Sequence, residues 1–197
     1  MSVCIVGSSG NLLTQELGEK IDSCDIVIRI QRFKIEGFEK HVGSKTSIIS
    51  LGWRGVEKSI KCLDTISDND NIILWSTHPL VGVRYQTVMS IFGHSNIVQP
   101  SQELYNEVIK RLYSDFWRKI PSSGIMTLEM ARNHFSDEKL FICGFDDKIE
   151  KDHYYDPDNI NYLAPGMTVS GHHWEKEWEY IQDLLEKKEI SHIRDIL

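Results

Sequence analysis

The sequence lacks a long apolar run and an excess of basic residues. Its 197 residues contain no run of about 18 apolar side chains, so we expect no integral membrane segment. Acidic side chains outnumber basic ones, and a formal net charge of −7 argues against a nucleic-acid partner. Neither a repeat nor a proline-rich linker divides the chain. The composition, 41% hydrophobic, therefore predicts one soluble globular domain over residues 1–197.

Cysteine is scarce and follows no pattern. The four cysteines are Cys4, Cys24, Cys62 and Cys143, and none belongs to a Cys-x-x-Cys pair. Cys4 and Cys143 lie within apolar runs, where small buried thiols are common. We interpret the cysteines as reduced and structural.

Short runs rich in β-branched residues recur between longer segments with helical periodicity. Strands are predicted at residues 3–6, 25–30, 46–50, 71–75, 96–99 and 139–145. Helices are predicted at residues 12–21, 56–66, 83–92, 102–117, 125–135 and 173–188. This alternation predicts an α/β fold, a single Rossmann-like domain with a mostly parallel, twisted sheet flanked by helices.

A glycine-containing loop, GSSGN at residues 7–11, directly follows the first predicted strand. In parallel sheets ligands bind beyond the carboxyl ends of the strands, where the strand order reverses. The glycines permit close backbone approach, while Ser and Asn offer hydrogen bonds to a phosphate, ribose or base. The loop is not Gly-x-Gly-x-x-Gly, and the acidic residue expected about 20 residues later is at best Asp25, so a nicotinamide enzyme is disfavoured.

A second loop, PSSG at residues 121–124, opens a segment with helical periodicity. The first backbone N–H groups of a helix have no partner within it, and the helix dipole adds positive potential there. Such a turn binds anions such as phosphate. The alternative is an ordinary helix start in which Ser122 and Ser123 serve only as caps.

Two histidines occur in distinctive surroundings. His153 opens the polar, aromatic segment HYYD, and His172 precedes a segment with one apolar helical face. We expect His172 at a helix N-terminus, where the dipole disfavours the imidazolium and leaves a neutral base. The adjacent His173 competes for that role. Glu177, five residues after His172, either supports the loop through hydrogen bonds or is a solvated helix residue.

Together these segments resemble the animal-type sialyltransferase family, whose four motifs occur here in the family's order. The long motif is similar to residues 6–46, and the short motif to residues 121–145. The third motif is similar to residues 153–156, and the very short one to His172 with Glu177. Residues 52–98 are not matched apart from generic strands.

This resemblance implies a GT-A-like variant of the fold and an inverting, metal-independent glycosyltransferase. It would move sialic acid, or a related sugar acid such as Kdo, from a CMP-linked donor to a hydroxyl of a glycan or glycoconjugate acceptor, with no cofactor. His172 would be the base and His153 would stabilise the leaving phosphate, with Glu177 in support. The residues implied in donor binding are Gly7, Ser8, Ser9, Asn11, Gln31, Ser122, Ser123, Gly124 and Tyr154.

The chain also departs from the family's pattern. Ser8 and Gln31 stand where the family usually has Asn, which leaves the identity of the donor open. The family joins its long-motif cysteine, here Cys4, to one in the short motif, but no cysteine lies near Phe135, so we do not expect that disulfide. We therefore expect a soluble protein of a reducing, cytoplasmic compartment, with a truncated Golgi lumenal domain as the alternative.

Two other functions stay open. A metal-dependent nucleotide-sugar transferase would use an Asp-x-Asp triplet, which occurs at residues 68–70 and 156–158, although both triplets read as turns. A CMP-binding protein without catalysis would fit the altered Ser8 and Gln31. Both His153 and His172 are retained, which argues against it because binding requires no base.

Overall fold

The computed structural model describes residues 1–52, 72–79, 86, 97–113, 120–145, 153–155 and 172–196. Their strands form one seven-stranded sheet in the order β5-β4-β3-β2-β1-β6-β7, and every neighbouring pair is parallel. The strands are β1 (Ser2–Val6), β2 (Ile26–Ile30), β3 (Ile48–Leu51), β4 (Ile73–Ser76), β5 (Ile97–Val98), β6 (Lys139–Cys143) and β7 (Ser191–His192). The predicted parallel α/β fold is confirmed. Strand β7 was not predicted, because two polar residues carry no strand pattern.

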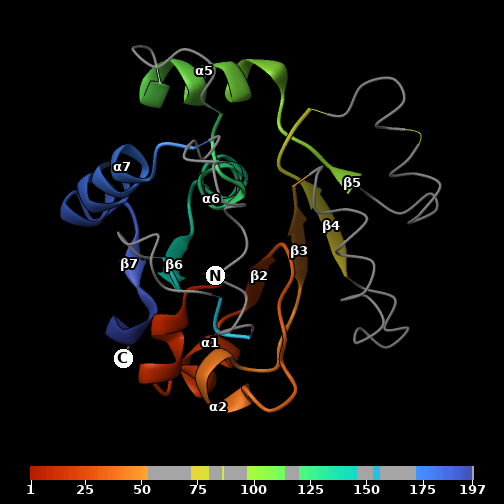
Figure 1. Cartoon of the computed structure of the whole chain (residues 1–197), viewed down its shortest axis with the longest axis vertical. Coiled ribbons are helices and arrows are strands. Elements are labelled where there is room, and N and C mark those ends of the chain that lie inside the picture. The colour runs from red at the N-terminus through yellow and green to blue at the C-terminus, as the bar shows by residue number, and fades with distance from the viewer. Residues whose placement is uncertain are drawn as a thin grey trace, which may run out of the picture.

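The strand order reverses beside β1. Strands β2 to β5 follow one another outward on one side of β1, whereas β6 and β7 lie on its other side (Figure 1). Val6 and Cys143, the last residues of β1 and β6, are paired in register. The carboxyl ends of these two strands therefore meet at one edge, which is where parallel sheets bind ligands.

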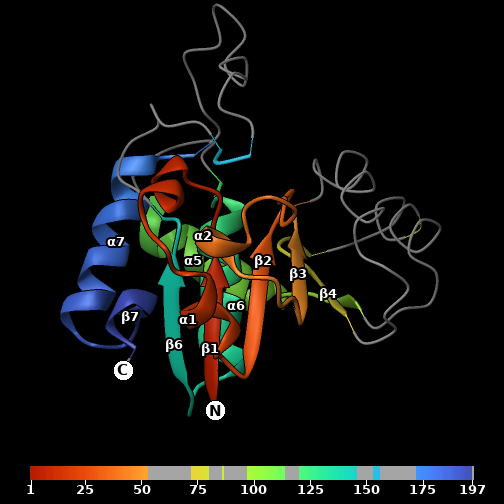
Figure 2. The same cartoon turned by 90° about the horizontal axis from the view of Figure 1, so that it is seen from below.

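Helices cover both faces of the sheet. One face carries the 3-10 helix η1 (Gly10–Thr14) with α1 (Gly18–Asp22) and α2 (Glu39–Val42). The other face carries α5 (Gln102–Tyr113), α6 (Ser123–His134) and α7 (Trp174–Glu186). Figures 1 and 2 show α6 against the sheet, α5 outside it, and α1 and α2 on the opposite side. A short 3-10 helix, η4 (Ile193–Asp195), follows β7.

Alternate residues of the central strand enter two different hydrophobic clusters. Val3 and Ile5 of β1 pack with the cluster that includes α5, α6 and α7. Cys4 and Val6 pack with the cluster that includes α1 and α2. A strand with both faces covered is apolar at every position, which is why residues 3–6 form a continuous buried run.

The single helix predicted over residues 12–21 is wrong. The segment divides into η1 and α1, and Gln15 between them is extended. Although the helix is interrupted at Gln15, Leu12 and Leu17 both pack into the same buried cluster. Tertiary packing therefore outweighs local helical periodicity. Gly18 begins α1 against the backbone of α2, where a Cβ atom would lie 2.0 Å from the carbonyl oxygen of Glu39.

Some predictions fall on residues that the structure does not describe. These are the helices at 56–66 and 83–92, apart from residue 86, together with residues 114–117, both Asp-x-Asp triplets and Cys62. Cys4, Cys24 and Cys143 are buried, and among the described residues their thiols are free. Among the described residues, no helix is long and apolar enough to cross a bilayer.

Candidate active site

A cavity of about 550 Å³, here called the central cavity, opens at the carboxyl ends of β1, β2 and β6. It collects most residues that the sequence assigned to the site, from five separate segments. They are Gly7, Ser8, Gln31, Ser122, Ser123, Gly124, His153, His172 and Glu177. Ser9, Asn11 and Tyr154 do not line it. The two histidines proposed for catalysis therefore face one hollow.

The floor of the cavity is formed where the loops after β1 and β6 touch. The N–H of Gly7 donates to the carbonyl of Cys143 at 2.8 Å. A Cβ atom at Gly7 would lie 2.2 Å from the carbonyl oxygen of Gly144, and Gly144 itself has φ of +71°. Only glycine fits such an approach, so both residues shape the floor with their backbone.

The start of α6 forms one wall. The Oγ of Ser122 accepts from the N–H of Ile125 at 3.2 Å, which makes Ser122 the helix cap. The Oγ of Ser123 accepts from the side-chain amide of Gln31, which adopts φ of +57° directly after β2. Gly52 lies beneath this pair, because its Cβ would stand 2.4 Å from Gln31 Nε2. The start of this helix, where the helix dipole adds positive potential, therefore lies in the cavity wall.

Glu177 joins α7 to the start of α6. Its side chain is 3% exposed, so the alternative of a solvated helix residue does not hold. Its Oε1 accepts from the backbone N–H of Ser122 at 2.9 Å and from the hydroxyl of Tyr113. Burial and the adjacent Glu177 carboxylate raise the pKa of Tyr113, which keeps the phenol protonated as a donor. Sequence reasoning missed Tyr113, because no local pattern connects it with α7.

His172 is oriented by a backbone carbonyl. Its Nδ1 lies 2.8 Å from the carbonyl oxygen of Ile120. Since a carbonyl can only accept, Nδ1 carries the hydrogen, and the lone pair of the neutral ring lies on Nε2. The ring also packs edge-on against Trp174, with 5.2 Å between the ring centroids. This arrangement suits a proton acceptor.

His173 has a different role from its neighbour. It is the N-cap of α7, and its Nδ1 accepts from the backbone N–H of Lys176 at 3.4 Å. It is not among the residues that line the central cavity. Of the two adjacent histidines, His172 faces the site and His173 caps the helix.

His153 is attached to the first glycine loop. It forms an antiparallel bridge with Ser9, and the N–H of Tyr154 donates to the carbonyl of Ser8 at 3.0 Å. Its ring stacks on Tyr155, with centroids 5.2 Å apart and planes 7° from parallel. Tyr154 is buried instead, and its hydroxyl donates to the carbonyl of Lys34 at 2.7 Å. Tyr154 thus anchors the segment while Tyr155 lines the cavity.

Several lining residues were not predicted. Arg32 follows Gln31 after β2 and brings a positive charge to the cavity. Its position at the carboxyl end of a predicted strand could have identified it as a site residue from the sequence. Phe145, Trp174 and Trp178 add aromatic walls. Within the described portion of the chain, no group of three or more His, Cys, Asp or Glu side chains could hold a metal ion.

The sequence model of Glycosyltransferase family 29 (sialyltransferase) matches residues 2–189. The chain belongs to this family. It is 25% identical over 167 residues to the CMP-N-acetylneuraminate-beta-galactosamide-alpha-2,3-sialyltransferase 1 of Sus scrofa, covering 77% of this chain and 46% of that protein. A shorter match of 48 residues, 52% identical, links it to Beta-1,6-galactosyltransferase GALT29A of Arabidopsis thaliana, over 24% of this chain and 12% of that protein.

The fold is similar to that of a solved mammalian sialyltransferase. A crystal structure of a mammalian sialyltransferase in complex with Gal-beta-1-3GalNAc-ortho-nitrophenol superposes with a TM-score of 0.70 at 22% identity. The match covers 96% of this chain and 67% of that one. The family 29 chain described here thus has an α/β, GT-A-like fold. It spans about half the length of the longer curated matches.

Proposed function

We propose that this family 29 protein is an inverting, metal-independent transferase that moves a sugar acid from a CMP-linked donor to a hydroxyl of a glycan. The names of its sialyltransferase relatives include CMP-N-acetylneuraminate, and the solved neighbour is in complex with Gal-beta-1-3GalNAc-ortho-nitrophenol. The observation that carries the proposal is that His172, which lines the central cavity, hydrogen-bonds through Nδ1 to the carbonyl of Ile120. That bond fixes the tautomer that a general base requires.

The base acts on the acceptor. A glycan hydroxyl is a weak nucleophile at neutral pH, so its proton must leave as the new glycosidic bond forms. His172 Nε2 takes this proton while the acceptor oxygen attacks the anomeric carbon. The bond from that carbon to the CMP phosphate oxygen breaks, and its electrons leave with the phosphate.

A different part of the cavity lining would stabilise the leaving phosphate. The N–H groups at the start of α6, together with Arg32 and His153, offer donors and positive potential where negative charge develops. These groups supply the stabilisation that a divalent ion gives in metal-dependent transferases. The transfer we propose therefore proceeds in the presence of EDTA.

The hydrogen bonds of Glu177 support the inverting route that we propose. A retaining, double-displacement route needs a carboxylate free to attack the sugar. Among the described residues, Glu177 is the carboxylate that lines the central cavity, and its Oε1 accepts from Ser122 and Tyr113. A single displacement by the acceptor needs no such nucleophile.

A donor screen tests the proposal. The protein is incubated with Gal-beta-1-3GalNAc and, in parallel, with CMP-sialic acid, CMP-Kdo or UDP-galactose, with and without EDTA. Nucleotide release is measured, and the anomeric configuration of the product is read by NMR. We expect release from a CMP-linked sugar acid that EDTA leaves unchanged, and a product of inverted configuration.

Three results would each overturn part of the proposal. Release from UDP-galactose alone would make the protein a galactosyltransferase, as the name of its plant relative states for that protein. Loss of release with EDTA would support a metal-dependent enzyme. Tight CMP binding with no release from any donor would support a binding protein without catalysis.

A further inference from the structure

A second pocket lies beside the central cavity. It has a volume of about 300 Å³, at the lower end of the range for small-molecule sites, and it shares Gly144, Phe145 and Trp178 with the central cavity. We call it the lateral pocket. Its lining comprises Asn11, Leu12, Gln15, Leu17, Ile142, Cys143, Gly144, Phe145, Trp178, Gln182, His192, Ile193 and Arg194. Neither His172 nor His153 lines it, whereas Asn11, which the sequence assigned to donor binding, does.

We propose that the lateral pocket is a subsite for a carboxylated sugar residue of the acceptor glycan. This inference rests on the proposed function, because it extends the acceptor beyond the hydroxyl that His172 activates. The volume suits one sugar ring, and the lining carries the three kinds of group that an acidic sugar requires.

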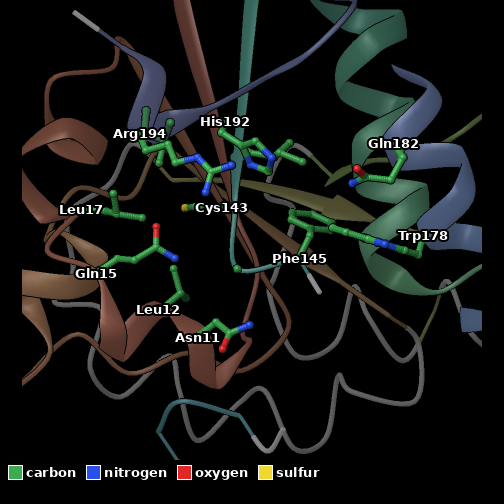
Figure 3. A pocket seen from close by; sticks show the side chains of 13 residues that line it. Asn11, Leu12, Gln15, Leu17, Cys143, Phe145, Trp178, Gln182, His192 and Arg194 are labelled. Atoms are coloured by element: carbon green, nitrogen blue, oxygen red, sulfur yellow. The ribbon is translucent and has the colours of Figure 1, made fainter. Parts of the chain in front are cut away.

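The first kind of group is a cation for the carboxylate. Figure 3 shows Arg194 reaching into the pocket from the segment after β7. Its side chain is 61% exposed, and its ion pair with Asp195 is long, at 3.9 Å. A guanidinium binds a carboxylate through two parallel hydrogen bonds, which a neutral sugar cannot provide.

The second kind of group serves the sugar hydroxyls. Two amide side chains reach the pocket from opposite sides, Gln15 from just after η1 and Gln182 from α7 (Figure 3). Burial lowers the pKa of His192, and the nearby Arg194 lowers it further, so its ring stays neutral and can both donate and accept. These groups match a ligand with several hydroxyls.

The third kind of group is aromatic. Phe145 and Trp178 line both the lateral pocket and the central cavity, so a sugar in one pocket lies next to the ligand in the other. A glycan whose terminal residue reaches His172 can place a neighbouring ring beside these side chains. Because the two pockets share these aromatic residues, one acceptor glycan can occupy both.

The backbone that carries Arg194 is firmly placed. His192 pairs with Ile142 of the central sheet. The ammonium of Lys20 donates to the carbonyls of Arg194 at 2.6 Å and of Ile196 at 2.8 Å. Ile193 is buried in the core. The guanidinium is therefore presented from an ordered platform, as a binding site requires.

Direct binding of matched sugars tests this assignment. Methyl β-glucuronide and methyl β-glucoside differ only at the carboxylate, and both are titrated by NMR into the protein with saturating CMP present. We expect the glucuronide to bind and Arg194→Gln to weaken it by about tenfold or more, with little effect on the glucoside. Gln182→Ala, on the opposite wall, should weaken both sugars.

Lys187→Gln is the charge-matched control. Lys187 is exposed, pairs with Asp183 and lies outside the lateral pocket, so this variant should bind the glucuronide normally. Equal affinity for both sugars, no binding of the glucuronide, or an unchanged affinity in Arg194→Gln would overturn the inference. Displacement of the glucuronide by equimolar inorganic phosphate would overturn it too, by revealing a general anion site. Failure of the proposed function would appear separately, as absent CMP binding in the unmodified protein.

Discussion

At the scale of single residues, His172 and His173 show how adjacent identical side chains acquire different chemistry. One hydrogen-bonds to the carbonyl of Ile120 and faces the central cavity, whereas the other caps α7. His173 directly precedes Trp174, the first residue of α7, and is therefore the residue that caps the helix. Substitution of His172 and substitution of His173 should therefore affect the rate of transfer differently.

Substitution of His172 tests the base assignment. His172→Ala should lower the rate of transfer about 100-fold or more, because no group then accepts the acceptor proton. CMP affinity should stay within a few-fold, since our proposal assigns nucleotide binding to other groups. Transfer is measured by product formation and affinity by calorimetry. His173→Ala is the control and should retain transfer; full activity in His172→Ala would contradict the assignment.

The contribution of the Glu177 hydrogen bonds to the free energy of unfolding can be measured. Glu177→Ala leaves the Ser122 N–H and the Tyr113 hydroxyl buried without their acceptor, at a cost of about 2–3 kcal/mol in the free energy of unfolding. Tyr113→Phe removes only one donor and should cost less. Urea denaturation measures both. A Glu177→Ala protein as stable as the unmodified one would show that the bond does not contribute.

At the scale of elements, short polar connections set how helices meet the sheet. Asp22 at the end of α1 accepts from the backbone N–H groups of Ser44 and Lys45, at 2.9 and 2.8 Å. Gly43 precedes them with φ of +68°, and its Cβ would lie 2.4 Å from Asp22 Oδ1. This clasp joins α1 to the turn between α2 and β3.

The clasp predicts a pH dependence. Although partial burial opposes ionisation of Asp22, hydrogen bonds from Lys45 and Ser44 outweigh it and lower the pKa. The stabilisation is complete above the unfolded value of about 4 and is lost as the pH falls through the lowered folded value. Asp22→Asn should cost about 1 kcal/mol at pH 7, and less at pH 3. Urea unfolding at both pH values measures this; a constant difference would contradict the assignment.

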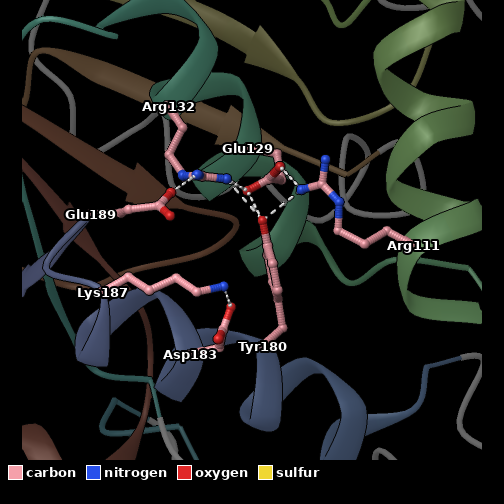
Figure 4. A network of polar contacts seen from close by, with 7 residues as sticks. All are labelled: Arg111, Glu129, Arg132, Tyr180, Asp183, Lys187 and Glu189. Carbon is pink, nitrogen blue, oxygen red and sulfur yellow. Dashed lines mark hydrogen bonds and ion pairs between the residues drawn. The ribbon is translucent and has the colours of Figure 1, made fainter.

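A second network joins the three helices of the other face. Glu129 of α6 is 4% exposed and accepts from Arg111 of α5 at 3.0 Å, from Arg132 at 2.8 Å and from Tyr180 of α7 at 2.9 Å (Figure 4). Burial and the Glu129 carboxylate raise the pKa of Tyr180 to about 12, so its phenol remains a donor. The network holds α7, which carries Glu177, against α6.

Removal of the carboxylate at its centre should loosen these helices. Glu129→Ala is expected to lower the free energy of unfolding by about 2 kcal/mol, because three donors lose a charged acceptor. The exposed pair between Lys187 and Asp183, also drawn in Figure 4, is the control, and Lys187→Ala should change stability by less than about 0.5 kcal/mol. Chemical denaturation compares the two; equal small effects would show that the buried network is not stabilising.

At the scale of the whole molecule, the central cavity is assembled from segments that are distant in sequence. Loops after β1, β2 and β6 meet the starts of α6 and α7, so a nucleotide bound as we propose would contact both sides of the strand-order reversal. A ligand that binds only this assembled state must oppose global unfolding.

CMP should therefore raise the melting temperature. At a concentration about 100 times its dissociation constant, the gain is about 2.7 kcal/mol, which corresponds to about 5–10 °C for a chain of this size. Differential scanning fluorimetry measures the shift. Ser123→Ala, which removes a hydroxyl from the cavity wall, should show a smaller shift at the same concentration. No shift for the unmodified protein would contradict nucleotide binding in this cavity.

The sequence by itself determined the parallel α/β architecture, because β-branched runs alternating with helical periodicity allow few other arrangements. It also indicated that the two glycine-containing loops, His153 and His172 belong to one site. Tertiary structure alone decided that Tyr155 rather than Tyr154 lines the cavity. It also decided that Glu177 meets Tyr113, that residues 12–21 break into two helices, and that a lateral pocket forms beside the site. These features depend on contacts between residues far apart along the chain, for which local pattern and propensity contain no information.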